Sequence, residues 1–152
     1  MSIDKKPWII RPMTPGEVEQ EPAAFARTDR ESREVTYDPA GLGTRAFPLA
    51  LRHEIGHIKS SSPEFWLYPE TNSMTESQWE DFKSKNPTWG DEENIFCELL
   101  AAYFSLSIDP RDWVARNEIK LQEEKANLVG IPRAKVSFMK RRARKLLKKL
   151  VE

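Results

Sequence analysis

The sequence predicts an α+β fold in which a small sheet packs on a helix and the C-terminal half is mostly helical. Residues 34–38 alternate and are β-prone, and a turn rich in proline and glycine follows them. After Pro48, and again through most of the second half, apolar residues recur at helical spacing. The 152 residues match one ordinary domain, which buries about two thirds of the surface that its unfolded chain exposes.

The chain divides into three segments by composition. Residues 1–33 carry prolines among scattered charges, which predicts an irregular lead-in with one short strand at residues 8–10. Residues 34–106 are expected to form the core of the domain. Residues 107–152 are expected to form the C-terminal helices, which end in a basic tail.

The first helix is predicted to begin near Pro48, which suits a first turn, and to stop at the serine-rich stretch 60–63. A long insert, 63–90, follows. It is expected to hold one short helix, because Thr75 and Gln78 have the spacing of a capping box.

Three further helices are predicted beyond the insert. Residues 90–91 open the first of them, whose apolar side makes it central to the core. The Asp-Pro pair at 109–110 is expected to cap and begin the next helix, and Gly130 to end it. Pro132 then begins the last helix.

Composition favours a cytoplasmic protein without a transmembrane segment. The chain is 39% hydrophobic and 32% charged, and no apolar run approaches the roughly 18 to 20 residues that span a bilayer. The N-terminus lacks the apolar stretch of a secretory signal, and the single Cys97 cannot form an internal disulfide. We therefore expect a reducing, cytoplasmic compartment.

Charge is unevenly spread although the net charge is zero. Between Glu64 and Glu98 there are nine acidic residues and two lysines, whereas from Arg111 onward there are thirteen basic and five acidic residues. The basic tail, 133–149, could dock on the domain as a solvated helix, which we favour. It could instead bind nucleic acid or an acidic membrane surface, or lie across the acidic middle as an inhibitory segment. Its expected apolar stripe is Phe138, Leu146, Leu147 and Leu150.

The strongest motif is His53-Glu54-Ile55-Gly56-His57, which contains both histidines of the chain. Residues four apart lie on one face of a helix, so both imidazoles can bind one zinc ion at about 2.0 to 2.1 Å. Glu54 can then reach a zinc-bound water, whose pKa zinc lowers to about 7, and act as general base. Two ordinary surface or core histidines are disfavoured, because the glutamate lies between them at the required spacing.

A catalytic zinc site needs a third protein ligand, and the chain has no further histidine. That ligand is therefore a carboxylate or Cys97. The pattern HExxHxxGxxH is excluded because Ser60 and Pro63 stand where its glycine and histidine would be. A resemblance to the SprT-like proteases, which supply a further histidine, is disfavoured for the same reason.

The motif resembles the gluzincin branch of the zincin metallopeptidases, in which HExxH on one helix is joined by a glutamate on a second helix. The run Glu-Leu-Leu-Ala that begins at Glu98, 41 residues after His57, is similar to that second helix. The resemblance covers residues 34–106 and implies a minimal zincin-like domain in which His53, His57 and Glu98 bind zinc. Gly56 and the alanine would allow the two helices to pack closely.

A different alignment of the chain with a gluzincin-like pattern leaves other residues open as the third ligand. Phage and bacterial repressor regulators with a gluzincin-like site often show Glu-Ala-Asn-x-Phe-Ala; the run from Glu92 matches at the Asn and Phe, but Glu93 replaces the first Ala. Glu98 is favoured, with Glu92 as the main alternative and Glu93, Asp91 and Cys97 after it. Peptide deformylases use an upstream Gly-Cys motif that is absent here, so Cys97 is favoured as a small core residue.

The resemblance implies a zinc-dependent peptidase that acts on a peptide or protein substrate. Tyr37, Tyr68 or Tyr103 could stabilise the oxyanion, and the strand at residues 35–37 could be the sheet edge that binds extended peptide. Two rival hypotheses stay open. One is a zinc-binding regulatory module that acts on a partner without general proteolysis, and the other is a helical protein in which HExxH arose by chance.

Overall fold

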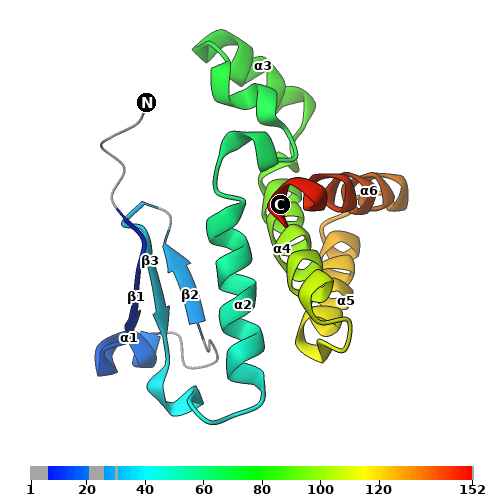
Figure 1. The fold of residues 1–152 in the computed structure, drawn as a ribbon. Helices are drawn as coiled ribbons and strands as arrows, with labels where there is room; N and C mark the ends of the chain where they lie inside the picture. The colour runs from blue at the N-terminus through cyan, green and yellow to red at the C-terminus, as the bar shows by residue number, and fades with distance from the viewer. Residues whose placement is uncertain (1–6, 21–25, 30, 152) are drawn as a thin grey trace.

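The computed structural model describes residues 7–20, 26–29 and 31–151. A small sheet lies on one side, the helix α2 (Ala46–Lys59) stands beside it, and the remaining long helices pack on the far side of α2 (Figure 1). The predicted α+β class is confirmed.

The sheet has three strands in the order β1-β3-β2. The central strand β3 (Glu34–Tyr37) pairs in parallel with β1 (Ile9–Pro12) and antiparallel with β2 (Ala26–Asp29). Strands were expected at residues 8–10 and 34–38, and both are confirmed within two residues.

The prediction that residues 1–33 are irregular is wrong for the described part, which supplies β1, the short helix α1 (Pro15–Gln20) and β2. The prolines of β1 and α1 stand at element ends, where a missing N–H is tolerated. The Ala-Arg-Thr-Asp run of β2 has no apolar alternation, so its strand conformation depends on pairing with β3.

Helix α2 positions the histidine motif between the sheet and the helical half of the molecule. It packs against β2 on one side and against α4 (Trp89–Ile108) on the other. Pro48 lies in its first turn, as predicted, and the Ser60 hydroxyl donates to the Gly56 carbonyl where the helix ends.

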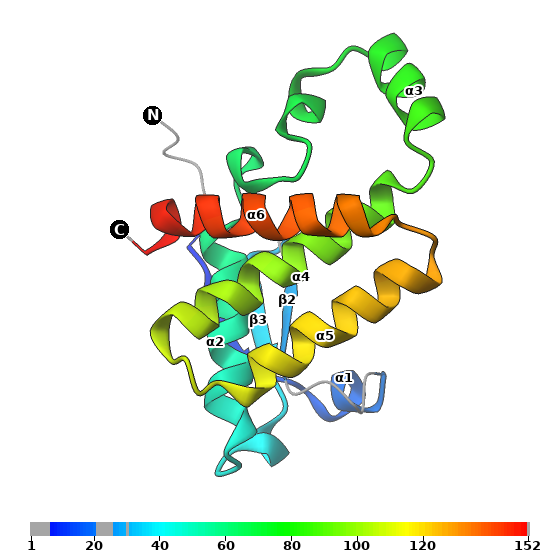
Figure 2. The same ribbon diagram turned by 90° about the vertical axis from the view of Figure 1, so that its right-hand side faces the viewer.

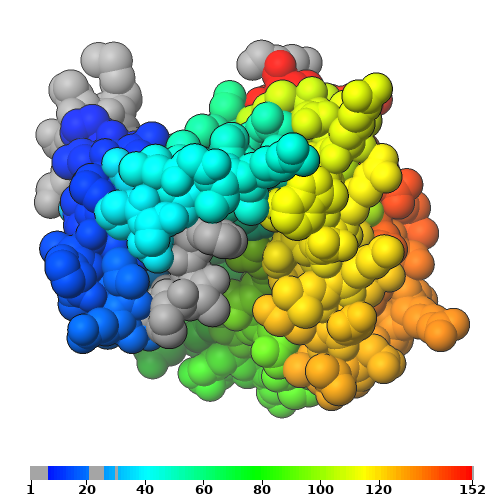
Figure 3. All heavy atoms as spheres, turned by 90° about the horizontal axis from the view of Figure 1, so that it is seen from below, coloured from blue at the N-terminus to red at the C-terminus, as the bar shows by residue number. Residues whose placement is uncertain are grey.

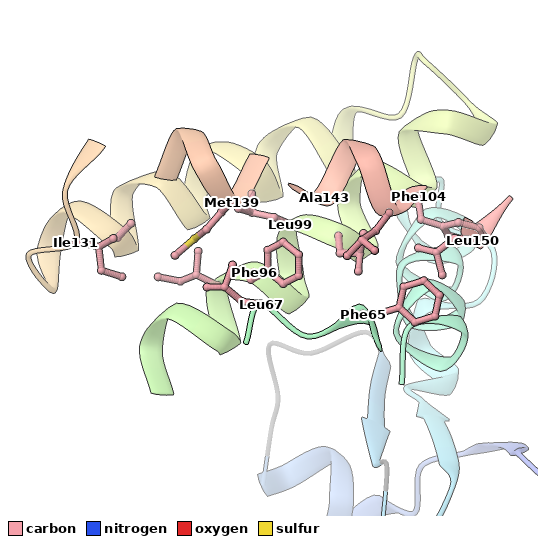
Figure 4. Close-up of a cluster of buried hydrophobic side chains, with 13 residues drawn as sticks. Phe65, Leu67, Phe96, Leu99, Phe104, Ile131, Met139, Ala143 and Leu150 are labelled. Atoms are coloured by element: carbon pink, nitrogen blue, oxygen red, sulfur yellow. The ribbon is translucent and has the colours of Figure 1, made fainter. Parts of the chain in front are cut away.

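Helix α4 is the centre of the hydrophobic core, as predicted. It is covered by α2, by α5 (Trp113–Leu128) and by α6 (Arg133–Leu150), and Phe65 and Leu67 of the insert lie along one side of the cluster (Figure 4). The largest fully buried apolar side chains of the cluster are Phe96, Leu99, Leu100 and Met139.

The predicted start of α5 is wrong by three residues. Asp109 caps the C-terminus of α4, and Asp112 is the N-cap of α5, where its carboxylate accepts a hydrogen bond from the Ala115 N–H at 2.9 Å. Asp112 is preferred because its buried carboxylate also accepts the Ser105 hydroxyl of α4. Gly130, with φ of +81°, follows the end of α5 as predicted.

Helix α6 docks on the domain, as the favoured interpretation of the basic tail predicted. It lies across α4 and beside α5 (Figure 2) and buries Met139, Ala143, Leu146 and Leu150. Phe138, which was expected in the apolar stripe, is 42% exposed; Met139, one residue further round the helix, faces the core instead.

The insert forms an arch that rises from the end of α2 and returns at the start of α4 (Figure 2). It contains α3 (Glu76–Lys85), whose predicted capping box between Thr75 and Gln78 is present. The ring contacts Tyr68–Phe82 and Trp79–Trp89 hold α3 to the arch, with centroid separations of 5.2 and 4.8 Å.

Seen from below, the N-terminal strands and α5 lie on opposite sides, and the segment leading into α2 bridges them (Figure 3). Among the described residues, no helix has the length and the apolar character needed to cross a membrane.

Candidate metal centre

Three side chains predicted as metal ligands meet between α2 and α4. His53 Nε2 lies 3.1 Å from His57 Nε2, and Glu98 places one carboxylate oxygen 2.6 Å from His53 Nε2 and the other 3.2 Å from His57 Nε2. Within the described residues these three form the one group whose donor atoms could hold a metal ion, all lying within 4.8 Å of one another.

The donor set and its spacing fit zinc. Four ligands at about 2.0 to 2.1 Å in a tetrahedron are separated by roughly 3.3 Å, close to the 3.1 and 3.2 Å found for two of the three pairs. The third separation, 2.6 Å, is that of a charge-assisted hydrogen bond. Two imidazoles and one carboxylate leave one tetrahedral position for water.

Close packing of the two helices brings the three ligands together. A Cβ built on Gly56 would lie 3.1 Å from the Ala101 Cα and 3.1 Å from the Phe104 ring, so only glycine fits at this crossing without a shift. Gly56 stands between the two histidines, and Ala101 lies three residues after Glu98 on α4. The small residues that the sequence suggested for close packing therefore do meet.

His57 and Glu98 stabilise each other's charged forms. Burial opposes ionisation of Glu98, but hydrogen bonds to His53 and His57 outweigh it and hold the pKa of Glu98 well below its usual range. Burial likewise disfavours a charged His57, yet hydrogen bonds to Cys97 and Glu98 raise its pKa to about 10. A metal ion would have to displace the proton held here, so metal binding should weaken as the pH falls.

Glu54, the predicted general base, lines the same cleft as His57 and Glu98 and meets β2 there. The Thr28 hydroxyl of β2 donates to Glu54 Oε2 at 2.5 Å, which fixes the carboxylate. Burial raises the pKa of Glu54 above its usual value, against the attraction of the neighbouring histidines. Sequence reasoning missed Thr28, because nothing in a four-residue polar stretch indicates which helix it will face.

Glu92, the main alternative ligand, lies outside the cluster. Its buried carboxylate accepts hydrogen bonds from the hydroxyls of Thr88, at 2.5 Å, and Tyr68, and lies 3.4 Å from the Lys135 ammonium. It thereby ties the insert and α6 to the start of α4. Its place in the first turn of that helix also suits a negative charge.

The other alternative acids have structural positions as well. Glu93 accepts the backbone N–H groups of Leu67 and Tyr68, at 3.1 and 2.8 Å, and so anchors the insert. Asp91 is exposed in the first turn of α4.

Cys97 is neither a ligand in this arrangement nor a core residue. Its sulfur lies 3.2 Å from His57 Nδ1, the ring nitrogen opposite the one that faces Glu98. It is partly exposed, so the expectation of a small core residue is wrong. An Nδ1–H donated to this sulfur would orient the ring and leave Nε2 for a metal.

The site opens into a cleft of about 920 Å³ that is lined by Glu54, His57 and Glu98 together with β2 and the insert. The side chain of Glu98 is 36% exposed, so the cluster is accessible from this cleft. No residue of α6 lines the cleft within the described part of the chain, although Lys135 and Lys149 pair with Glu92 and Glu64 of the acidic middle.

A further expectation about the cleft is wrong. The strand at residues 35–37 is central, and β2 is the sheet edge that lines the cleft, because β1 pairs with the other side of β3. Of the tyrosines, Tyr68 bonds Glu92 and Lys135, Tyr37 packs on Phe47, and no tyrosine is among the described residues that line the cleft.

Comparison with known proteins found no matching family model, no similar curated protein and no similar solved structure.

Proposed function

We propose that this protein is a zinc-dependent metallopeptidase with a zincin-like fold of the gluzincin type. The observation that carries the proposal is the juxtaposition of His53, His57 and Glu98 with Glu54 at the wall of one open cleft. Two neutral imidazoles and a carboxylate from two crossing helices form the ligand set of a catalytic zinc site. A cytoplasmic setting belongs to the same proposal, since the one cysteine cannot form an internal disulfide.

Each residue has a defined role in this reaction. Zinc, when bound, supplies a Lewis acid for the peptide carbonyl and lowers the pKa of water. His53, His57 and Glu98 would hold the ion. Glu54 accepts the proton of the attacking water and passes it to the leaving amine, and Thr28 keeps its carboxylate oriented.

The edge strand β2 supports a peptide as the substrate. In the described sheet β2 pairs with β3 on one side only, and its four residues line the cleft. An extended peptide can add to such an edge through backbone hydrogen bonds. That addition would lay the peptide along α2, beside Glu54.

Zinc analysis of purified variants tests the proposal. We expect one zinc per wild-type chain, loss of zinc in Glu98→Gln, and retention of zinc in the matched control Glu92→Gln, whose carboxylate lies outside the cluster. Glu54→Gln should keep zinc and lose cleavage of a peptide library. A wild-type chain that binds no zinc after reconstitution would leave the chance motif as the better explanation.

The outward face of α6 favours a second candidate function, a zinc-binding regulatory module that acts through a partner. Arg141, Lys145 and Lys148 are exposed and recur at helical spacing on one face, and α6 has no acidic residue. Such a basic stripe fits nucleic acid or another acidic surface.

Outward charge substitutions test this second function. A zinc-loaded protein that cleaves no peptide, yet binds duplex DNA with an affinity that falls with salt, would favour the regulatory module. The double variant Lys145→Gln/Lys148→Gln should then weaken DNA binding without loss of zinc. Unchanged DNA binding in that variant would argue against a role for α6.

A further inference from the structure

Three of the five tryptophans of the chain line the cleft that contains Glu54 and Glu98. Trp66 and Trp79 come from the insert, and Trp89 begins α4. All three are partly buried, and each keeps some surface open to the cleft. One wall of the cleft is therefore built from a group of indole rings.

The backbone at Trp66 is fixed from two directions. The Arg142 guanidinium of α6 donates two hydrogen bonds, of 3.2 and 2.8 Å, to the Trp66 carbonyl. The Glu93 carboxylate of α4 accepts the N–H groups of the next two residues, Leu67 and Tyr68. Trp66 is thus held in place before any ligand arrives, which reduces the entropy lost on binding.

The outer rings of the wall hold one another. Trp79 meets Trp89 edge to face at 4.8 Å and stacks on Phe82 at 6.0 Å, and the Lys83 ammonium lies 5.5 Å from the Trp79 ring. These contacts fix the orientation of the Trp79 ring on a helix that few other contacts attach to the domain.

The insert contributes no charged side chain to the lining of the cleft. Its lining residues are Phe65, Trp66, Thr71, Asn72 and Trp79. Glu93 of α4 also lines the cleft, but its carboxylate is already bonded to backbone N–H groups. The other charged lining residues belong to β2, α2 and α4. On this wall an apolar ring would gain contact area against the indoles.

We propose that Trp66, Trp79 and Trp89 form a subsite for a large aromatic side chain of the substrate peptide, next to the bond that is cleaved. The inference rests on the proposed peptidase function and names the class of substrate: peptides with Phe, Tyr or Trp beside the scissile bond. Aromatic side chains suit the subsite because rings pack edge to face or offset on indoles.

Cleavage of matched peptides tests the subsite. Internally quenched peptides differ at a single position, which carries Phe, Ala or Asp and is moved along both sides of the scissile bond. The zinc-loaded wild type should cleave the best Phe peptide at least about tenfold faster, in kcat/KM, than its Ala counterpart, as expected for one aromatic contact. Asp should be worse than Ala.

The variants Trp79→Ala and Trp66→Ala should each reduce that Phe preference to about threefold or less. Trp113→Ala is the matched control, because Trp113 is 52% exposed on α5 and does not line the cleft. Zinc content and melting temperature are measured for every variant. The inference is overturned if the wild type shows no aromatic preference, or if Trp113→Ala reduces it as much as Trp79→Ala does.

A binding experiment separates failure of the subsite from failure of the proposed function. Fluorescence anisotropy reports binding of labelled Phe and Ala peptides to zinc-loaded Glu54→Gln protein, with and without Trp79→Ala. If the wild type cleaves nothing, the peptidase proposal fails; tighter binding of the Phe peptide that depends on Trp79 would still support the subsite. Equal binding of both peptides would refute it.

Discussion

Replacing Gly56 with alanine should weaken zinc binding at least about tenfold while leaving the metal-free protein folded. The added Cβ would lie 3.1 Å from the Ala101 Cα, whereas ordinary contacts begin at 3.4 Å. The Phe104 ring can turn away, but Ala101 presents backbone, so α2 and α4 must separate by about 0.3 Å. Zinc sites tolerate ligand shifts of about 0.2 Å, and the separation falls between the two histidines and Glu98.

The effects of this substitution on stability and on zinc binding are measured separately. Alanine gains about 1 kcal/mol over glycine in a helix, and overpacking costs about 1 to 3 kcal/mol, so the free energy of unfolding should change by no more than about 2 kcal/mol. The dissociation constant for zinc should rise at least about tenfold, which corresponds to about 1.4 kcal/mol. A chelator competition titration measures the second quantity, and denaturant unfolding of metal-free protein measures the first.

Gly90→Ala is the matched control for this experiment. Gly90 lies in the first turn of α4, and a Cβ built there meets no atom within 4 Å. The same chemical change should leave zinc affinity unaltered. Wild-type zinc affinity in Gly56→Ala would refute the claim that this helix crossing sets the ligand geometry.

Three further changes test other contacts. Thr28→Ala removes the hydrogen bond that orients Glu54, so kcat should fall about tenfold or more while zinc content and KM stay near wild type; an unchanged kcat would show that Thr28 does not position the base. Asp112→Ala removes a buried helix cap and should cost about 2 kcal/mol of stability, or about 4 to 8 °C in melting temperature. Asp109→Ala, at the partly exposed C-cap of α4, is a milder control. Glu92→Gln should cost a similar amount at neutral pH. Burial alone would raise the pKa of Glu92, but hydrogen bonds to its carboxylate lower the pKa below 4.5. The ionised carboxylate therefore stabilises the fold fully above pH 4.5, and this stabilisation is lost as the pH falls through the folded-state pKa. Melting curves of metal-free wild type and Glu92→Gln should therefore converge toward acid pH; a constant difference would contradict the ionic role of Glu92.

The residues of the candidate centre could be predicted because each leaves a local signal. Histidines at i and i+4 share a helix face wherever the helix lies, and the small residues Gly56 and Ala101 indicate that two helices approach closely. The choice of Glu98 over Glu92 depends on how α2 and α4 pack against each other. Motif fit favoured the residue that the structure brings to the histidines, and Glu92 proved to be bonded elsewhere.

The sheet edge and the cleft wall could not be predicted, because they depend on pairing between distant segments. The polar run of β2 has no strand pattern of its own, and only its pairing with β3 places Thr28 beside Glu54. The tryptophans of the insert are spread along the chain without a period, so the sequence does not indicate that Trp66 and Trp79 share a wall.

The last helix of the chain braces the wall of the cleft. Arg142 holds the Trp66 carbonyl, and Lys135 reaches the Tyr68 hydroxyl at 2.7 Å, so two residues on one side of α6 reach the insert. Deleting α6 to ask whether its cations bind a partner would therefore also loosen the wall of the cleft. A truncated protein that lost activity could have lost the support of the insert rather than the contact with a partner. Substitutions confined to Lys145 and Lys148 remove only the cations and so separate partner binding from support of the insert.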